Sequence, residues 1–244
     1  MQIFDELTIG IEEEYQIIDA ESRELTSFIT EFMEQGAILF NENVKPEFLQ
    51  SQIEVGSSVC KDIQEARNEI CRLRNLVSDI AAKNKCQIIA AGTHPFSKWK
   101  DQLVTNNERY RGLLDSMQIV AKRLLIFGMH VHIGIKDRDL RIDIMNQMRY
   151  FMPHILTLST SSPFWWGQKT GFKSYRSIVF EDLPRTGIPE MFNSYVEYDE
   201  YIKTLIKCGC IDEATKIWWD IRPCLLYTSD AADDMQCVDL GGRR

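Results

Sequence analysis

The alternation of apolar and polar positions predicts the strands of this chain. The clearest run covers residues 8–18 and reads TIGIEEEYQII, with most of its apolar side chains in one phase. Similar runs predict four further strands, in residues 47–59, 86–96, 128–135 and 215–223. The first run is unusual because it contains Glu12, Glu13 and Glu14 in succession, and glutamate is depleted from strands. Either one face of this strand lies in water, or a cation compensates the acids.

The helical spacing of apolar residues predicts the helices. The strongest candidate covers residues 62–84, with Asp62 as N-cap and an apolar stripe made of Ile63, Ala66, Ile70, Leu73, Val77 and Ile80. Further helices are expected in residues 108–127, in residues 137–159 with an interruption near Pro153, and around residues 198–207. Glycine and proline punctuate residues 164–189 and predict a loop. This order of elements indicates an α+β fold, a mainly antiparallel sheet with helices on one face.

Polar pairs two residues apart recur in three of the predicted strands. They are Glu12 with Glu14, Gln52 with Glu54, and His130 with His132. Side chains two apart share a sheet face, whereas Glu13 falls on the opposite, mostly apolar face. If the three polar faces belong to one face of one sheet, three glutamates and two histidines converge. Oxygen-rich ligation of this kind favours Mg²⁺ or Mn²⁺ over Zn²⁺.

Plainer explanations of the same residues stay open at this point. A glutamate-rich strand can simply face solvent, and one H-x-H pair is weak support for a metal site. The sequence contains no phosphate-binding loop, no dinucleotide fingerprint and no G-x-S-x-G motif, so those nucleotide and hydrolase folds are not supported.

Composition narrows the class of protein. The chain has 244 residues, which fits one large or two small domains, and its net charge of −8 argues against nonspecific nucleic-acid binding. No secretory signal and no membrane-length apolar run is recognisable. Seven scattered cysteines favour reduced thiols in a cytoplasmic protein. The lone C-x-C formed by Cys208 and Cys210 favours structural thiols over a metal site.

A series of motifs follows the order found in one known family. The motifs read TIGIEEEYQIID, EFLQSQIEVGSSVC, NERYRGLL, GMHVHIGI, YFMPHILTLSTSSPFWWG, SYRSIVFEDLPRTGIP and IWWDIRP. By these motifs, residues 4–223 resemble the glutamate–cysteine ligase type 2 family, the bacterial carboxylate–amine ligases. The resemblance implies a glutamine synthetase-like fold, in which an antiparallel sheet forms a funnel that holds ATP and Mg²⁺ (or Mn²⁺) on its inner face.

The resemblance also implies a reaction, a step of glutathione biosynthesis. The γ-carboxylate of glutamate takes the γ-phosphoryl group of ATP, and the amine of cysteine then displaces phosphate to give γ-glutamylcysteine. The alternative is a non-catalytic nucleotide- or metal-binding relative with the same fold. The expected partners are small-molecule substrates rather than nucleic acid or membrane. The amine acceptor and the oligomeric state stay open, a homo-oligomer being one alternative.

The resemblance suggests roles for individual residues. Glu12, Glu14 and Glu54 resemble metal ligands, His132 resembles a metal ligand or a phosphate contact, and His130 is a weaker candidate for contact with the cofactor. Arg176 and Arg222 are candidate catalytic residues that would hold phosphate or a substrate carboxylate, with a structural salt bridge as the alternative for each. Arg222 is also a candidate for cofactor binding. Arg109 and Tyr110 are candidates for packing or substrate binding, and the aromatic run 164–166 for packing.

The end of the chain departs from the family pattern. The family continues after WWDIRP with a strand patterned T-x-E-x-R, whereas residues 224–244 read CLLYTSDAADDMQCVDLGGRR. We interpret residues 1–223 as an incomplete, C-terminally truncated ligase catalytic domain and residues 224–244 as a non-native or divergent tail. The tail is expected to stay outside the sheet, to leave an open sheet edge, and to make this chain an inactive fragment.

Overall fold

The computed structural model describes residues 7–40, 43–223 and 235–239, and its centre is one antiparallel sheet. In the described part this sheet has seven strands in the order β10-β11-β5-β1-β3-β2, with β4 also pairing with β1. Their bounds are β1 Thr8–Asp19, β2 Val44–Pro46, β3 Gln52–Gly56, β4 Cys86–Ile89, β5 Met129–Gly134, β10 Ile221–Pro223 and β11 Met235–Asp239. Each of these pairings is antiparallel, as expected for the sheet.

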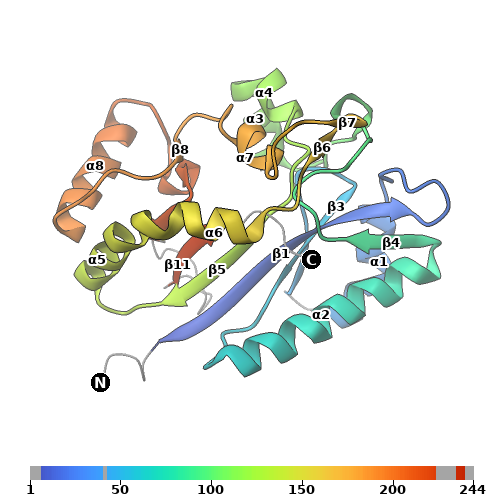
Figure 1. Cartoon of the computed structure of the whole chain (residues 1–244), viewed down its shortest axis with the longest axis horizontal. Coiled ribbons are helices and arrows are strands. Elements are labelled where there is room, and N and C mark those ends of the chain that lie inside the picture. Colours follow the sequence, from blue (N-terminus) through green and yellow to red (C-terminus); the bar gives the residue numbers. More distant parts are fainter. Residues whose placement is uncertain (1–6, 41–42, 224–234, 240–244) are drawn as a thin grey trace.

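Two pairs of helices cover one face of the sheet. Helices α1 (Ile29–Phe40) and α2 (Ile63–Lys83) pack against Tyr15, Ile17 and Ile53 in one apolar cluster. A second apolar cluster joins Met129 and Ile221 to α5 (Arg138–Met148) and α8 (Tyr195–Lys207). The partly buried Ile11 packs against both clusters, so a single face of β1 carries the core. Figure 1 shows α1 and α2 along one half of the sheet and α5 along the other. The predicted α+β architecture is confirmed.

Most of the remaining elements border the opposite, polar face or link the layers, whereas α6 (Met152–Ser159) packs in the second apolar cluster through Met152 and Ile155. Their bounds are α3 Glu108–Met117, α4 Ile119–Lys122, α6 Met152–Ser159, α7 Tyr175–Phe180, β6 Phe164–Trp165, β7 Gln168–Lys169, β8 Thr186–Gly187 and β9 Trp218–Trp219. Short 3-10 turns occupy Trp99–Asp101, Arg149–Phe151 and Ala214–Lys216. A third apolar cluster, which includes Phe48, Leu125 and Phe127, packs against α3. No helix in the described part combines the length and the apolar character that crossing a membrane requires.

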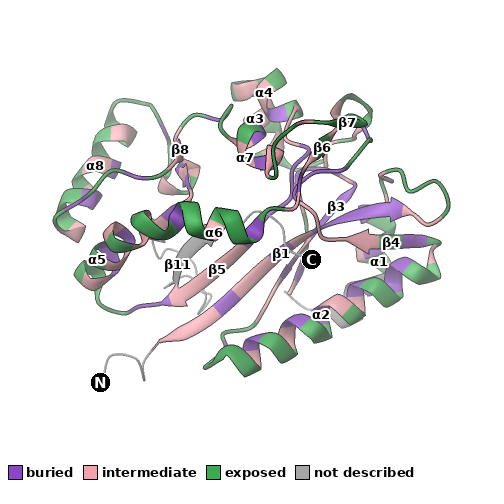
Figure 2. Ribbon diagram, viewed as in Figure 1, coloured by how far each residue is buried: buried purple, intermediate pink, exposed green. Residues whose placement is uncertain are grey.

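Helix α2 follows its sequence closely. The Asp62 side chain accepts a hydrogen bond from the Glu65 backbone N–H at 2.8 Å, which caps the helix as predicted. The predicted stripe is buried except for Ile63, which is 73% exposed. Side chains of a helix lean toward its N-terminus, so Ile63 at the first position projects beyond the helix end. Figure 2 shows the resulting alternation of buried and exposed positions along α2.

Other helix predictions need correction in detail. The helix expected over residues 108–127 breaks at Gln118, whose φ of +49° is incompatible with a right-handed helix. The interruption expected near Pro153 is the 3-10 turn Arg149–Phe151 directly before α6. Helix α1 was not predicted, because Gly36 sits in its middle and its apolar residues are too frequent to show a clear stripe. Strand β2 was too short to predict.

The expectation that the tail stays outside the sheet is wrong for Met235–Asp239. This segment forms β11, which pairs with β5 and with β10, so in the described residues it fills the position where an open edge was expected. The prediction relied on the Asp-rich residues 229–234, which lie outside the described residues, whereas the segment after them contains Met235, Cys237 and Val238. The interpretation of residues 224–244 as non-native or divergent stays a prediction.

Candidate active site

The strand register brings the predicted polar pairs together. In the pairing of β1 with β3, Glu14 lies opposite Glu54. In the pairing of β1 with β5, Glu12 lies opposite His130, and Gly10 lies opposite His132. Residues directly opposite each other in neighbouring strands share a sheet face. The expected convergence of the three polar pairs on one face is therefore confirmed.

A cavity of about 1700 Å³ opens over this polar face. Five of the predicted site residues besides Glu12 are among those that line it, and they are Glu14, Glu54, His130, Arg176 and Arg222. His132 does not line the cavity and contacts Glu12 instead. Helices α3 and α7 and the loop before β9 contribute further parts of the wall.

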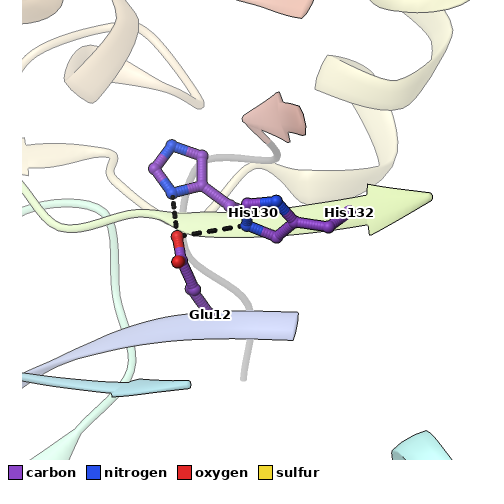
Figure 3. Close-up of side chains that lie close together, drawn as sticks. All are labelled: Glu12, His130 and His132. Atoms are coloured by element: carbon purple, nitrogen blue, oxygen red, sulfur yellow. Dashed lines mark hydrogen bonds and ion pairs between the residues drawn. The ribbon is translucent and has the colours of Figure 1, made fainter. Parts of the chain in front are cut away.

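Glu12, His130 and His132 form the first cluster of candidate ligands. One carboxylate oxygen of Glu12, Oε2, lies 3.1 Å from His130 Nδ1 and 3.2 Å from His132 Nε2 (Figure 3). Burial favours the neutral carboxyl, but hydrogen bonds and charge attraction from both histidines outweigh it and hold the pKa of Glu12 well below its usual range. An ionised carboxylate only accepts hydrogen bonds, so both rings donate to Glu12.

Glu14, Glu47 and Glu54 form the second cluster. One carboxylate oxygen from each lies within 4.8 Å of those of the other two. Burial, reinforced by the charge of Glu47, raises the pKa of Glu14 from 4.5 to about 7, although the Gly128 N–H donates to Glu14 at 2.6 Å. Burial also raises the pKa values of Glu47 and Glu54, and the neighbouring carboxylates add to the effect on Glu54. The basic residues around this cluster do not offset its burial.

Glu47 is the site residue that sequence reasoning missed. The predicted strand over residues 47–59 would place Glu47 on the face opposite Glu54, because odd and even positions alternate. In the structure β3 begins only at Gln52, and the Phe48 backbone N–H donates to the Glu47 carboxylate at 2.6 Å. The loop before β3 thus turns Glu47 into the cavity that Glu54 also lines. The only sequence signal for Glu47 was the presence of an acid seven positions before Glu54. The alternation of faces along a strand cannot place a residue that lies outside the strand.

Glu13 points away from both clusters, as predicted. It is only 4% exposed, on the helix-covered face of β1. Arg74 of α2 donates from Nε to Glu13 at 2.8 Å and forms a second contact through Nη2, and the Tyr15 hydroxyl also donates to Glu13. This partly buried ion pair joins β1 to α2, while Glu12 and Glu14 project to the opposite face.

Both predicted arginines reach the cavity. Arg176 on α7 is 8% exposed and donates from Nε to the Phe127 carbonyl at 2.7 Å. Arg222 on β10 donates from Nη1 to the Ile217 carbonyl at 3.2 Å, and its Nη2 lies 3.4 Å from His130 Nε2. The contacts to backbone carbonyls orient each guanidinium at the wall of the cavity that the acids line.

The other predicted candidates divide between the wall and the surface. Arg109 and Tyr110 line the cavity, and the Tyr110 hydroxyl donates to the Pro46 carbonyl at 3.3 Å. The aromatic run 164–166 is not part of the cavity lining. Within it, Trp165 packs near Tyr175 and Trp166 stacks on Trp99 with ring centroids 6.2 Å apart.

The donor atoms of both clusters suit divalent cations, and those of the three-glutamate cluster suit hard ones. Mg²⁺ and Mn²⁺ prefer carboxylate oxygens, and Mn²⁺ also accepts imidazole nitrogen. Three mutually close acids whose pKa values are all raised form an arrangement that a bound cation would compensate. The residues present therefore fit divalent cations, with Glu14, Glu47 and Glu54 as one candidate ligand set and Glu12, His130 and His132 as another.

Comparisons with known proteins identify the family of this chain. A sequence model of the glutamate-cysteine ligase family 2 (GCS2) matches residues 8–229. A protein of Herpetosiphon aurantiacus, provisionally called glutamate–cysteine ligase 2, is 57% identical over 216 residues, which are 88% of this chain and 56% of that protein. A protein of Sorangium cellulosum with the same provisional name is 50% identical, over 89% of this chain and 59% of that protein. The chain thus spans little more than half the length of these relatives.

Solved structures show the same fold at low sequence identity. A bifunctional glutathione synthetase from Pasteurella multocida matches 99% of this chain and 36% of its own length, with a TM-score of 0.73 and 13% identity. A glutamate–cysteine ligase from Francisella tularensis, solved with AMP, matches 97% of this chain and 61% of its own, with a TM-score of 0.66 and 14% identity. From the match to the family's sequence model and these close relatives, the chain belongs to the glutamate-cysteine ligase family 2.

Proposed function

We propose that the polar face of β1 is the cation and nucleotide site of an ATP-dependent carboxylate–amine ligase, with glutamate as the carboxylate substrate and cysteine as the amine. The observation that carries the proposal is the pair of adjacent candidate ligand sets, whose members all line one cavity except His132, with Arg176 and Arg222 in the cavity wall. Phosphoryl transfer depends mainly on positioning and charge neutralisation, which such an arrangement supplies. The structural neighbour solved with AMP supports a nucleotide in this fold.

In the proposed reaction, an oxygen of the glutamate γ-carboxylate attacks the γ-phosphorus of ATP and ADP leaves. The cysteine amine then attacks the acyl carbon, loses a proton and releases phosphate. Divalent cations, when bound, neutralise the phosphate oxygens and align them for transfer. Glu14, Glu47 and Glu54 would hold one cation, and Glu12 with His130 or His132 would hold another.

The arginines have a different part in the proposal. A guanidinium presents parallel N–H donors that match two oxygens of a phosphate or a carboxylate. The Nε of Arg176 donates to the Phe127 carbonyl, and the Nη1 of Arg222 donates to the Ile217 carbonyl. Each guanidinium group is thus held in place by one of its nitrogens. Both side chains line the cavity that the acids share, where a phosphate or a substrate carboxylate would need positive charge.

The proposal is tested by measuring binding and turnover separately. Isothermal titration with Mg·ATP reports binding, and a phosphate-release assay with glutamate and a panel of amines reports ligation. We expect Glu14→Gln to weaken binding of Mg·ATP, while Glu200→Gln, at an exposed position on α8, leaves it unchanged. Binding without turnover for any amine, in a chain extended to the relatives' length, would favour a non-catalytic binding protein. Equal Mg·ATP affinity for the wild type and Glu14→Gln would contradict the proposed site.

A further inference from the structure

A second cavity, of about 780 Å³, lies outside the candidate active site. Its wall combines the segment after β4, the end of α6 and the segment that leads into β6, and includes Ala91, Thr93, Leu158, Ser162 and Lys173. No residue lines both this cavity and the larger one. Its volume falls within the roughly 300–1,000 Å³ that is typical of small-molecule sites.

The second cavity contrasts in charge with the rest of the protein. The protein carries a net charge of −8, and the larger cavity is lined by acids such as Glu14, Glu47 and Asp212. The residues that line the second cavity include no aspartate or glutamate, and the positively charged residue among them is Lys173. Within the described residues, Lys173 has no ion-pair partner. A cation in an acid-free pocket of an acidic protein attracts a small anion.

The lining also includes Ser162, whose hydroxyl is held at a fixed position. The Ser162 Oγ accepts a hydrogen bond from the Arg176 backbone N–H at 3.1 Å, and among the described residues it donates to none. A hydroxyl that accepts in this way keeps its own proton for another acceptor. Ser162 is 1% exposed, and its backbone N–H donates to the Lys173 carbonyl at 3.1 Å. The backbones of the serine and the lysine are therefore held together.

Neighbouring contacts make the wall pre-formed. The Gly92 N–H donates to Ser161 Oγ at 3.1 Å, and the Thr93 hydroxyl donates to the Phe164 carbonyl at 2.9 Å. A Cβ on Gly92 would lie 3.2 Å from the Ser162 side chain, so the two segments pack closely. A pre-formed pocket loses less conformational entropy on binding than a mobile one.

We propose that this second cavity is a binding site for a small organic anion, with its carboxylate or phosphate group at Lys173 and Ser162. A short apolar part of the ligand would contact the alanines, Pro95 and Phe164, which are among the non-polar residues of the lining. The site is separate from the proposed ligase site, so neither proposal depends on the other.

The test uses two probes of the shared oxyanion chemistry, inorganic phosphate and butyrate. Isothermal titration is carried out with EDTA, so that no divalent cation carries phosphate into the larger cavity. We expect Lys173→Gln to weaken binding of the preferred probe by about tenfold, the effect of losing one charge-assisted hydrogen bond. Leu158→Glu, at a 76% exposed position of the lining, adds a repelling charge and should also weaken binding.

Two control variants locate the binding. Lys169→Gln removes an exposed lysine of β7 that does not line the cavity, and Arg222→Gln removes a cation of the larger cavity. Both should keep the wild-type affinity. The proposal is overturned if neither probe binds up to about 10 mM, if Lys173→Gln binds as well as the wild type, or if only Arg222→Gln loses binding. A preference for phosphate or for butyrate would identify which oxyanion group the site accepts.

Discussion

Glu12 and Glu14 lie two residues apart on the same strand and the same sheet face, yet their surroundings are opposite in charge. Glu12 faces two imidazoles that donate to one of its oxygens. Glu14 faces two further carboxylates, from Glu47 and Glu54. The pKa of Glu12 is held below its usual range, whereas that of Glu14 is raised to about 7. The first cluster thus carries compensating groups of its own, whereas the described residues around the second do not offset its burial, and we propose that a cation from solution compensates it.

The largest expected effect is the loss of cation affinity when a ligand of the second cluster is removed. Glu14→Gln removes one of three charged ligands, and we expect it to weaken Mn²⁺ binding by about 100-fold, on the order of 3 kcal/mol. Without metal, Glu14→Gln should melt no lower than the wild type, because it relieves repulsion between buried carboxylates. Isothermal titration with Mn²⁺ and a melting curve in EDTA measure both. A melting temperature that falls by many degrees would instead make Glu14 a structural residue.

A second effect concerns the pH dependence of the metal-free protein. The pKa of Glu14 is higher in the folded chain than its usual 4.5, so the folded state holds the proton more tightly. Proton binding by Glu14 therefore contributes to the stability of the folded state, on the order of 2 kcal/mol. This contribution is complete below about pH 4.5 and is lost as pH rises through about 7. Bound cation removes the penalty. The gain in melting temperature from Mn²⁺ should therefore be larger at pH 8 than at pH 5.5. A gain that does not change with pH in the wild type would contradict this reasoning.

Glu12→Gln should have the opposite sign to Glu14→Gln in the metal-free protein. It removes the carboxylate that accepts from His130 and His132. Because the Glu12 side chain is 35% exposed, solvent screening limits the loss of stability to about 1 kcal/mol, a few degrees in melting temperature. Thermal unfolding in EDTA at pH 7 is the measurement. If both variants shift the melting temperature in the same direction, the contrast between the clusters is wrong.

The smallest expected effect concerns Lys45, whose positive charge partly compensates the acids of the second cluster. Lys45 on β2 lies opposite Glu54 and opposes the rise of its pKa, although burial dominates. Lys45 is exposed, so Lys45→Gln should lower the free energy of unfolding of the metal-free protein at pH 8 by only about 0.5 kcal/mol. A slightly lower melting temperature would report this loss. The difference should shrink at pH 5.5, because the raised pKa of Glu54 favours its protonated form as the pH falls. A larger loss at the lower pH would show that Lys45 acts by packing instead.

Period-two reasoning predicted the essential geometry of the site. It placed Glu12, Glu14 and Glu54 on one face and Glu13 on the other, because alternation in a regular strand leaves no choice of face. The same reasoning failed at Glu47, which precedes the regular part of the strand and reaches the cavity through a loop. Local sequence cannot determine the path of such a loop, because contacts distant in the chain determine it.

The fold shows a similar division. Helix α2 was predictable because its cap and its apolar stripe are both encoded locally. Helix α1 was missed because most of its positions are apolar and tertiary packing decides its structure. The pairing of β11 with β5 joins segments far apart in the chain, so the sequence of the tail alone did not predict it.

The most direct test of the central claim is anomalous diffraction from crystals grown with Mn²⁺ and a non-hydrolysable ATP analogue. We predict an anomalous peak bounded by carboxylate oxygens of Glu14, Glu47 and Glu54, at metal–oxygen distances of about 2.2 Å. A second, separate peak is expected beside Glu12 and its histidines. An ordered nucleotide with no anomalous density among Glu14, Glu47 and Glu54 would contradict the claim that this cluster holds a cation.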